Sequence, residues 1–213
     1  MKNNNRFTTA QLTLLGLMAA ILLLMAYTPL GYLNIGPLAV TFNVIPVAVC
    51  AIVLGPTGGA IAGAVFGLTS FMQAIGIGGV SALGSALFQI NPFMTAVQCF
   101  GPRILDGICI GFIYRAVHKK ANTYVSCAVT GFFSAFLNTL FFMTALIVMF
   151  GNTELIRNLM GGHNIIVGCC LMVGVNAISE MVSSTIITAA VGTALSKAHL
   201  IPAVQIVKTD TAA

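Results

Sequence analysis

The chain has 213 residues, of which 58% are hydrophobic and 6% are charged, and its mean hydropathy is +1.02. This composition excludes a water-soluble globular domain and is typical of a protein embedded in a membrane. At roughly 20 apolar residues for each bilayer crossing, the length leaves room for about six helices and none for a separate soluble enzyme domain. The net charge of +5 does not indicate nucleic-acid binding, because the lysines and arginines form no basic stripe.

The apolar runs predict an all-α membrane protein with six transmembrane helices, in one integral membrane domain covering 1–213. The expected helices span residues 9–27, 43–54, 57–75, 102–117, 123–149 and 164–196. Pro56, in the turn LGPTGG, is suited to a helix start because it lacks the amide hydrogen that would be unpaired there. The Gly-rich stretches 28–42 and 76–98 are predicted to be long loops after the first and third helices.

The positions of the cations predict the orientation. They precede the first helix, link the fourth to the fifth, and follow the sixth; these residues are Lys2, Arg6, Arg115, Lys119, Lys120, Lys197 and Lys208. With six crossings all three sites lie on one side, which the positive-inside rule assigns to the cytoplasm. We therefore expect both termini in the cytoplasm and the longer loops outside, in the cell membrane of a prokaryote.

Small residues recur every four positions on two of the expected helices. Gly59, Gly63 and Gly67 form such a row on 57–75, and Gly16 with Ala20 repeats the spacing on 9–27. Rows of this kind let two helix backbones approach closely in a membrane. The row on 57–75 favours contact within the chain, whereas the row on the first helix is equally compatible with contact to another subunit.

Polar residues within the expected spans carry most of the functional information, since ionisable groups in a membrane usually face a partner or a cavity. Asn176 and Glu180 are four residues apart and share a helix face, and helix counting places Asn138 at a similar depth to Asn176. Asn43 begins the second expected helix. Each could instead make only a structural hydrogen bond between helices.

Arg103 and Asp106 are expected at the outer end of the fourth helix, with Asp106 one turn deeper. They could form a purely structural ion pair. Alternatively, the planar guanidinium of Arg103 could bind a carboxylate or phosphate of a solute while Asp106 orients it. Both interpretations remain open at the level of the sequence.

Signals for catalysis are weak. The three histidines fall in separate loops, so no metal-ligand spacing exists, and no cofactor is indicated. The six cysteines include no C-x-x-C pair, and no nucleotide-binding Walker motif is present. We expect the chain not to be an enzyme and not to hydrolyse ATP itself.

Several strings together resemble the substrate-binding S component of energy-coupling-factor (ECF) vitamin transporters, most closely its pantothenate branch. These strings are LGPTGGAIAGAVFGLTSF (54–71), NVIPVAVCAIVLGP (43–56), FGPRILDGICIGFIYR (100–115) and NAISEM (176–181). The resemblance covers about residues 10–196 and implies a six-helix protein that binds a small vitamin at its outer face. It also implies a transmembrane coupling subunit and two cytoplasmic ATP-binding-cassette ATPases as partners, in addition to membrane lipid.

The resemblance also assigns roles to particular residues. The family's small-residue motif on the first helix contacts the coupling subunit, and here it reads Gly16-x-x-x-Ala20. The candidate substrate-binding residues are Arg103, Asn138, Asn176, Glu180, Asn43 and Gln98. Pantothenate is preferred because one arginine beside several amide groups suits a short polar acid.

Other functions remain as alternatives. Folate and riboflavin members of the family share much of the pattern, although a flat ring would favour more aromatic residues in the pocket. An intramembrane enzyme would need a convergent set of acid, base or metal groups, which Asp106 and Glu180 alone do not supply. A stand-alone secondary carrier would be expected to contain two related halves, and no convincing repeat is present.

Overall fold

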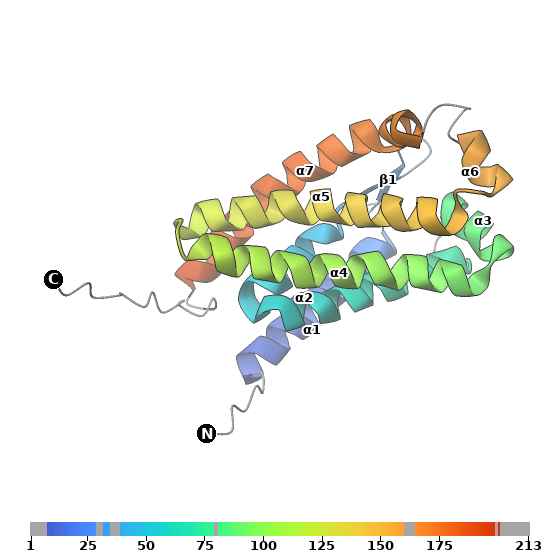
Figure 1. Ribbon diagram of the computed structural model, residues 1–213. Coiled ribbons are helices and arrows are strands. Elements are labelled where there is room, and N and C mark those ends of the chain that lie inside the picture. Colours follow the sequence, from blue (N-terminus) through green and yellow to red (C-terminus); the bar gives the residue numbers. More distant parts are fainter. Residues whose placement is uncertain are drawn as a thin grey trace, which may run out of the picture.

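The computed structural model describes residues 8–28, 32–34, 39–78, 81–159, 165–198 and 200 (Figure 1). Within them the helices are α1 (Thr9–Ala26), α2 (Val44–Ala74), α3 (Ala82–Ile90), α4 (Pro92–His118), α5 (Thr123–Phe150), α6 (Glu154–Leu159) and α7 (Ile165–Lys197). Two short strands, β1 (Tyr32–Asn34) and β2 (Ala39–Thr41), pair antiparallel with Tyr32 opposite Thr41. Five of these helices, α1, α2, α4, α5 and α7, are long and apolar enough to cross a membrane.

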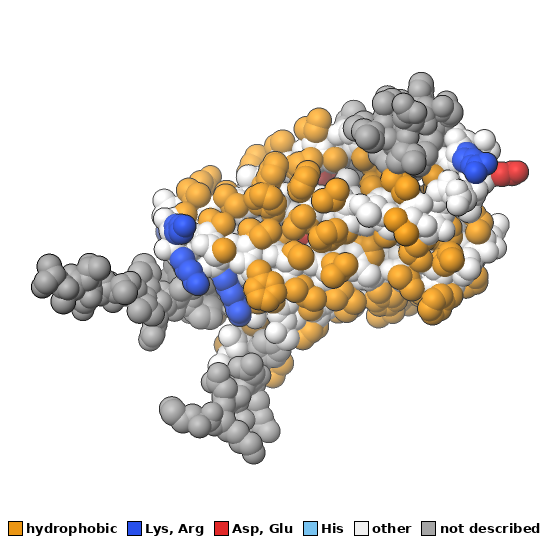
Figure 2. Space-filling model, in the orientation of Figure 1, with side chains coloured by type: hydrophobic (Ala, Val, Ile, Leu, Met, Phe, Trp, Pro, Cys, Tyr) orange, Lys and Arg blue, Asp and Glu red, His pale blue; other side chains and the backbone are white. Residues whose placement is uncertain are grey.

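The beginning of α1, the connection between α4 and α5, and the end of α7 lie at the same end of the bundle (Figure 1). We call it the α4–α5 end. Arg115, Lys119 and Lys120 are exposed there, and Figure 2 shows basic side chains gathered at this end and hydrophobic ones along the flank. Lys2, Arg6 and Lys208 lie outside the described residues.

Helix α4 begins ten residues earlier than the sequence prediction placed it, at Pro92 rather than at 102. The predicted long loop 76–98 is wrong, because α3 and the first turns of α4 occupy most of it. The Asn91 side chain accepts a hydrogen bond from the Met94 amide (3.1 Å), and Pro92 occupies the first turn, where a missing amide hydrogen has no cost. These start signals outweigh the local polarity that favoured a loop. Gln98 therefore lies within a helix.

Helix α2 is broken at Gly55. Its backbone angles there (φ 71°, ψ −164°) are accessible almost only to glycine, and Pro56 begins the second arm of the helix. The expected boundary between 54 and 57 falls at this break. A side chain at Gly55 would also collide with the guanidinium of Arg115, so the break lies at the α4–α5 end.

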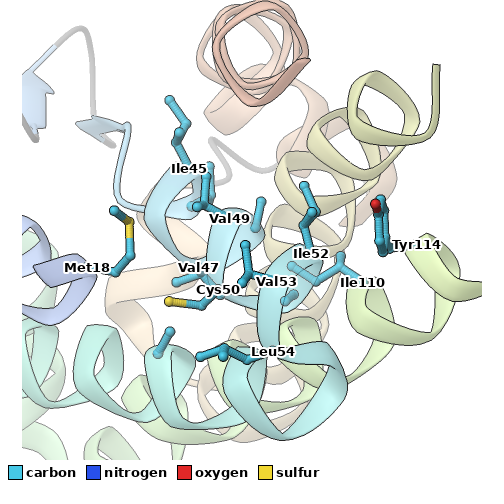
Figure 3. Close-up of a cluster of buried hydrophobic side chains, with 14 of the residues drawn as sticks. Met18, Ile45, Val47, Val49, Cys50, Ile52, Val53, Leu54, Ile110 and Tyr114 are labelled. Atoms are coloured by element: carbon cyan, nitrogen blue, oxygen red, sulfur yellow. The ribbon is translucent and has the colours of Figure 1, made fainter. Parts of the chain in front are cut away.

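The first arm of α2, residues 44–54, is buried on every side. Figure 3 shows its side chains between Met18 of α1 on one flank and Ile110 and Tyr114 of α4 on the other. A helix that is apolar all round belongs in the centre of a bundle. Its contacts with α1, α4, α5 and α7 make it the core of the fold.

The first arm begins in the middle of the bundle rather than at its surface. The Ser134 hydroxyl donates to the main-chain oxygen of Val44 (3.3 Å), and Ser134 lies about 16 Å along α5 from the α4–α5 end. The arm itself is also about 16 Å long. The segment that precedes it, expected to be an outer loop, therefore ends at mid-depth.

The second arm of α2 packs directly against the backbone of α4. A Cβ atom built on Gly59, Gly63 or Gly67 would lie 2.1 to 2.9 Å from the main-chain oxygens of Gly107, Arg103 or Cys99, respectively. These close approaches explain the row of small residues on this arm, because any side chain would separate the two helices.

We predict that Gly63→Ala lowers the free energy of unfolding by about 1–3 kcal/mol, as overpacking does, because its methyl group would meet the main-chain oxygen of Arg103. Gly101→Ala is the matched control, since only a Val97 methyl group, at 4.0 Å, faces that position. It should be neutral or stabilising by up to about 1 kcal/mol. Thermal unfolding of the detergent-solubilised variants measures both. Equal stability of the two variants would contradict the tight contact between α2 and α4.

Candidate functional site

Buried polar side chains line two neighbouring helices at a spacing of four residues. On α5 they are Ser126, Thr130, Ser134 and Asn138. On α7 they are Asn176, Glu180, Ser184 and Thr188. A spacing of four keeps each row on one helix face, and both rows are turned toward the interior.

The two rows come together because α5 and α7 pack closely at Gly131. A Cβ atom there would lie 2.4 Å from the main-chain oxygen of Ser184. Counted from this contact, Asn138 lies about 10 Å along α5 and Asn176 about 12 Å along α7, in the same direction. The two amides are therefore at similar depth in the bundle, and both are buried.

Glu180 ties the strand hairpin to α7. Its carboxyl oxygen Oε1 accepts a hydrogen bond from the Thr41 amide at 2.6 Å. The Thr41 hydroxyl in turn accepts from the Asn43 amide at 3.3 Å. The junction between β2 and α2 is thus held against the middle of α7.

The side chain of Asn43 is completely buried, and neither its Oδ1 nor its Nδ2 atom has a hydrogen-bond partner. Next to it, Ser134 contacts the main chain of Val44 and also hydrogen-bonds the side chain of Asp106. The second carboxyl oxygen of Asp106, Oδ1, is buried without a partner. Unpaired buried polar atoms of this kind are unusual and require an explanation.

Arg103 lies about 16 Å from the start of α4, so its predicted position at the outer end of the helix is wrong. Its Nη1 atom donates to the main-chain oxygens of Cys99 (3.0 Å) and Gln98 (3.3 Å). Its Nε atom is buried and has no partner. Within the described residues Arg103 forms no ion pair with Asp106, so the purely structural pair is not present.

Two aromatic rings bracket the guanidinium of Arg103. Its central carbon lies 4.6 Å from the ring centre of Phe66 in α2 and 5.5 Å from that of Phe142 in α5. The Gln98 amide donates to the main-chain oxygen of Phe142 (2.8 Å), while its own side-chain oxygen is buried and unpartnered. These contacts hold the charged group in one orientation.

Together these interactions form a closed circuit, which we call the polar ring. Its members are Thr41, Asn43, Ser134, Asp106, Arg103 and Glu180. Hydrogen bonds or chain adjacency connect the members from Glu180 round to Asp106. Arg103 completes the set as the neighbouring cationic group, without a hydrogen bond to either carboxyl group.

The unpartnered atoms at the ring include both hydrogen-bond donors and hydrogen-bond acceptors. Arg103 Nε is a cationic donor, Asp106 Oδ1 and Gln98 Oε1 are acceptors, and the Asn43 amide offers one of each. A small solute with an anionic oxygen, hydroxyl donors and an amide carries groups of the matching kinds. The arrangement suits binding, because the charged group is already oriented before a ligand arrives.

The ring gathers three predicted site residues, Asn43, Arg103 and Glu180, while Gln98 is joined to Arg103. Asn138 lies one turn from Ser134 on the same face of α5. Sequence reasoning missed Thr41, Ser134, Phe66 and Phe142 as neighbours of these residues. The row spaced by four on α5 could have pointed to Ser134, but no local signal marks the two phenylalanines.

Gly16 and Ala20 take no part in the ring. Both are exposed on α1, and nothing lies within 4 Å of a Cβ atom built on Gly16. The buried face of α1 is the opposite one, formed by Leu14, Met18, Leu22 and Ala26. The small residues therefore face away from the rest of this chain.

Residues 10–192 match the family described as ECF transporter, substrate-specific component. The chain belongs to this family. It is 33% identical over 205 residues to the pantothenate transporter PanT of Leuconostoc mesenteroides, covering 92% of this chain and 95% of that protein. It is 27% identical over 203 residues to the pantothenic acid transporter PanT of Lactococcus lactis, covering 89% of this chain and 95% of that protein. The resemblance inferred from the sequence is confirmed, and this S component is a multi-pass membrane protein.

We predict that Glu180→Ala speeds hydrogen exchange at the Thr41 amide about tenfold or more, because the hydrogen-bond acceptor of that amide is lost. Glu180→Gln should have a smaller effect, since an amide oxygen still accepts the bond. Ser179→Ala, at an exposed neighbouring position, is the control. Unchanged exchange in Glu180→Ala would show that the hairpin is held by other contacts.

Proposed function

We propose that this S component binds pantothenate, or a closely similar short polar acid, for ATP-driven uptake. The observation that carries the proposal is that Arg103, held near two aromatic rings, has a buried Nε atom without a partner, as do the acceptor atoms Asp106 Oδ1 and Gln98 Oε1 on the same helix. Both similar proteins described above are named as transporters of this vitamin, which supports the same choice.

The functional groups of pantothenate correspond to the open atoms of the site. Its carboxylate would accept a hydrogen bond from Nε of Arg103, because the planar fork of guanidinium donors matches a carboxylate. Its hydroxyl groups would donate to Asp106 Oδ1 or Gln98 Oε1, and its amide would pair with Asn43. Asn138 and Asn176 lie at a depth from which they could contact the remaining polar atoms.

The cations support an orientation in which the α4–α5 end faces the cytoplasm. In this orientation both termini are cytoplasmic and six helical segments, counting the two arms of α2 separately, form the membrane domain of a prokaryotic cell membrane. The first arm is only about half as long as a helix that crosses the membrane. In this orientation the strands β1 and β2 would occupy the other half of the bilayer, between the outer face and the start of the arm. Substrate would enter the ring from that face.

Transport would require partners, because the chain carries no nucleotide-binding motif of its own. We propose a transmembrane coupling subunit and two ATP-binding-cassette ATPases, as the family implies. The exposed row containing Gly16 and Ala20 would receive the coupling subunit, since small residues allow close helix contact. An enzymatic role is not proposed.

We predict that the purified chain binds pantothenate with a Kd at or below about 1 μM, and that Arg103→Ala weakens this affinity at least about tenfold, or about 1.4 kcal/mol. The measurement is a binding titration by calorimetry, with folate and riboflavin as competing candidates. Arg115→Ala is the matched control, because this arginine is exposed at the α4–α5 end of the same helix. Loss of folded protein with unchanged affinity in the remainder would assign Arg103 a structural role only.

We predict that Gly16→Leu and Ala20→Leu abolish association with the coupling subunit while leaving pantothenate affinity unchanged, because the new side chains would project from an exposed face. Co-purification with the complete transporter measures association. Ala10→Leu, at the edge of the same exposed face, is the matched control and should still assemble. Equal loss of binding and association would indicate that this row packs within the chain.

A further inference from the structure

Pro102 lies in the interior of α4, ten residues after its first residue. In a regular helix the amide of residue 102 would donate to the main-chain oxygen of Gln98, four residues earlier. Proline has no amide hydrogen, and its ring pushes that carbonyl outward. The proline therefore leaves the Gln98 oxygen without its usual helical donor.

The next residue supplies the missing donor. Arg103 Nη1 reaches the Gln98 oxygen at 3.3 Å and also the Cys99 oxygen at 3.0 Å. A carbonyl released by a proline in a membrane helix normally needs such a replacement, because no water is at hand. Pro102 therefore leaves the Gln98 oxygen free, and the side chain of the next residue, Arg103, donates a hydrogen bond to it.

This bond determines which part of the guanidinium remains available. Nη1 is occupied by main-chain oxygens, and the rings of Phe66 and Phe142 bracket the group. The Nε atom on another edge is left buried and unpartnered. A guanidinium anchored through Nη1 cannot turn to present a different edge without breaking two hydrogen bonds.

We propose that Pro102 is a positioning residue for recognition of the substrate's carboxylate. By releasing the Gln98 carbonyl it anchors Arg103 so that the Nε edge points to the ligand. This inference rests on the proposed function and deepens it, because it assigns the preference for an acid over a neutral analogue to two adjacent residues. A proline needed only to bend α4 against α2 would have no bearing on that preference.

The test is the ratio of two affinities, for pantothenate and for the analogue in which a primary alcohol replaces the carboxylate. Pro102→Ala restores the helical donor to Gln98 and competes with Arg103 for its anchor. We expect the acid-over-alcohol preference to fall about three- to tenfold, while affinity for the alcohol changes less than twofold, because only the contact with the carboxylate depends on the anchor. Both titrations use the same protein sample, so the ratio does not depend on the folded fraction.

Pro92→Ala is the matched control on the same helix, since Pro92 is exposed in the first turn and releases no carbonyl. The acid-over-alcohol preference of Pro92→Ala should equal that of the unaltered chain. Pro102→Gly is a second variant, which also restores the donor but lets the helix keep a bend. It should lose the preference as Pro102→Ala does.

Several outcomes would overturn the proposal. An unchanged preference in both Pro102 variants would do so, as would an equal loss of affinity for acid and alcohol, which indicates a change in the whole site. If neither Pro102 variant folds, the role of Pro102 is only to allow α4 to fold, and the proposal is contradicted. If the unaltered chain binds neither compound, the proposed function itself is contradicted. If Arg103→Ala loses the acid-over-alcohol preference while both Pro102 variants keep it, the proposed function stands and only the role of Pro102 is contradicted.

Discussion

The guanidinium group of Arg103 is partly buried in an apolar bundle, and the cost of shielding that charge from water constrains the structure around it. Arg103 meets this cost with two main-chain oxygens of its own helix and two aromatic rings, not with a carboxylate. No hydrogen bond or ion pair joins Arg103 to Asp106 or Glu180, all of which are described residues. One oxygen of Asp106 and the Nε atom of Arg103 remain buried without a hydrogen-bond partner.

Two interruptions of regular helix structure, in α2 and in α4, affect the position of residues in the polar ring. The break at Gly55 ends a half-length first arm of α2, so that Asn43 at its start lies in the middle of the bundle. Pro102 interrupts α4 directly beside Arg103. Irregular backbone at membrane depth is tolerated only where protein buries it, and both segments are buried. Glycine contacts join α2 to α4 at both places, with Gly111 against the break at Gly55 and Gly63 against Arg103, the residue after Pro102.

Two of the helices that pack against the first arm of α2, α1 and α4, differ in the residues they bury. On one side, α1 buries Leu14, Met18, Leu22 and Ala26 and leaves its small residues exposed. On the other, α4 contributes Arg103 and Asp106 to the polar ring. The first arm of α2 therefore lies between the surface proposed for the coupling subunit and the proposed substrate site.

The sequence by itself determined the class of protein, the family and most helix positions, because apolar runs of spanning length and rows of small residues are local patterns. It also singled out Arg103, Asn43 and Glu180, since polar groups stand out in apolar spans. It misplaced the start of α4 and with it the depth of Arg103, although Asn91 and Pro92 carried a start signal. Only the tertiary structure decided what Arg103 contacts, because Phe66 and Phe142 come from other helices and are ordinary phenylalanines in the sequence. The polar ring joins segments up to 139 residues apart, and such pairings depend on how whole helices pack rather than on any local pattern.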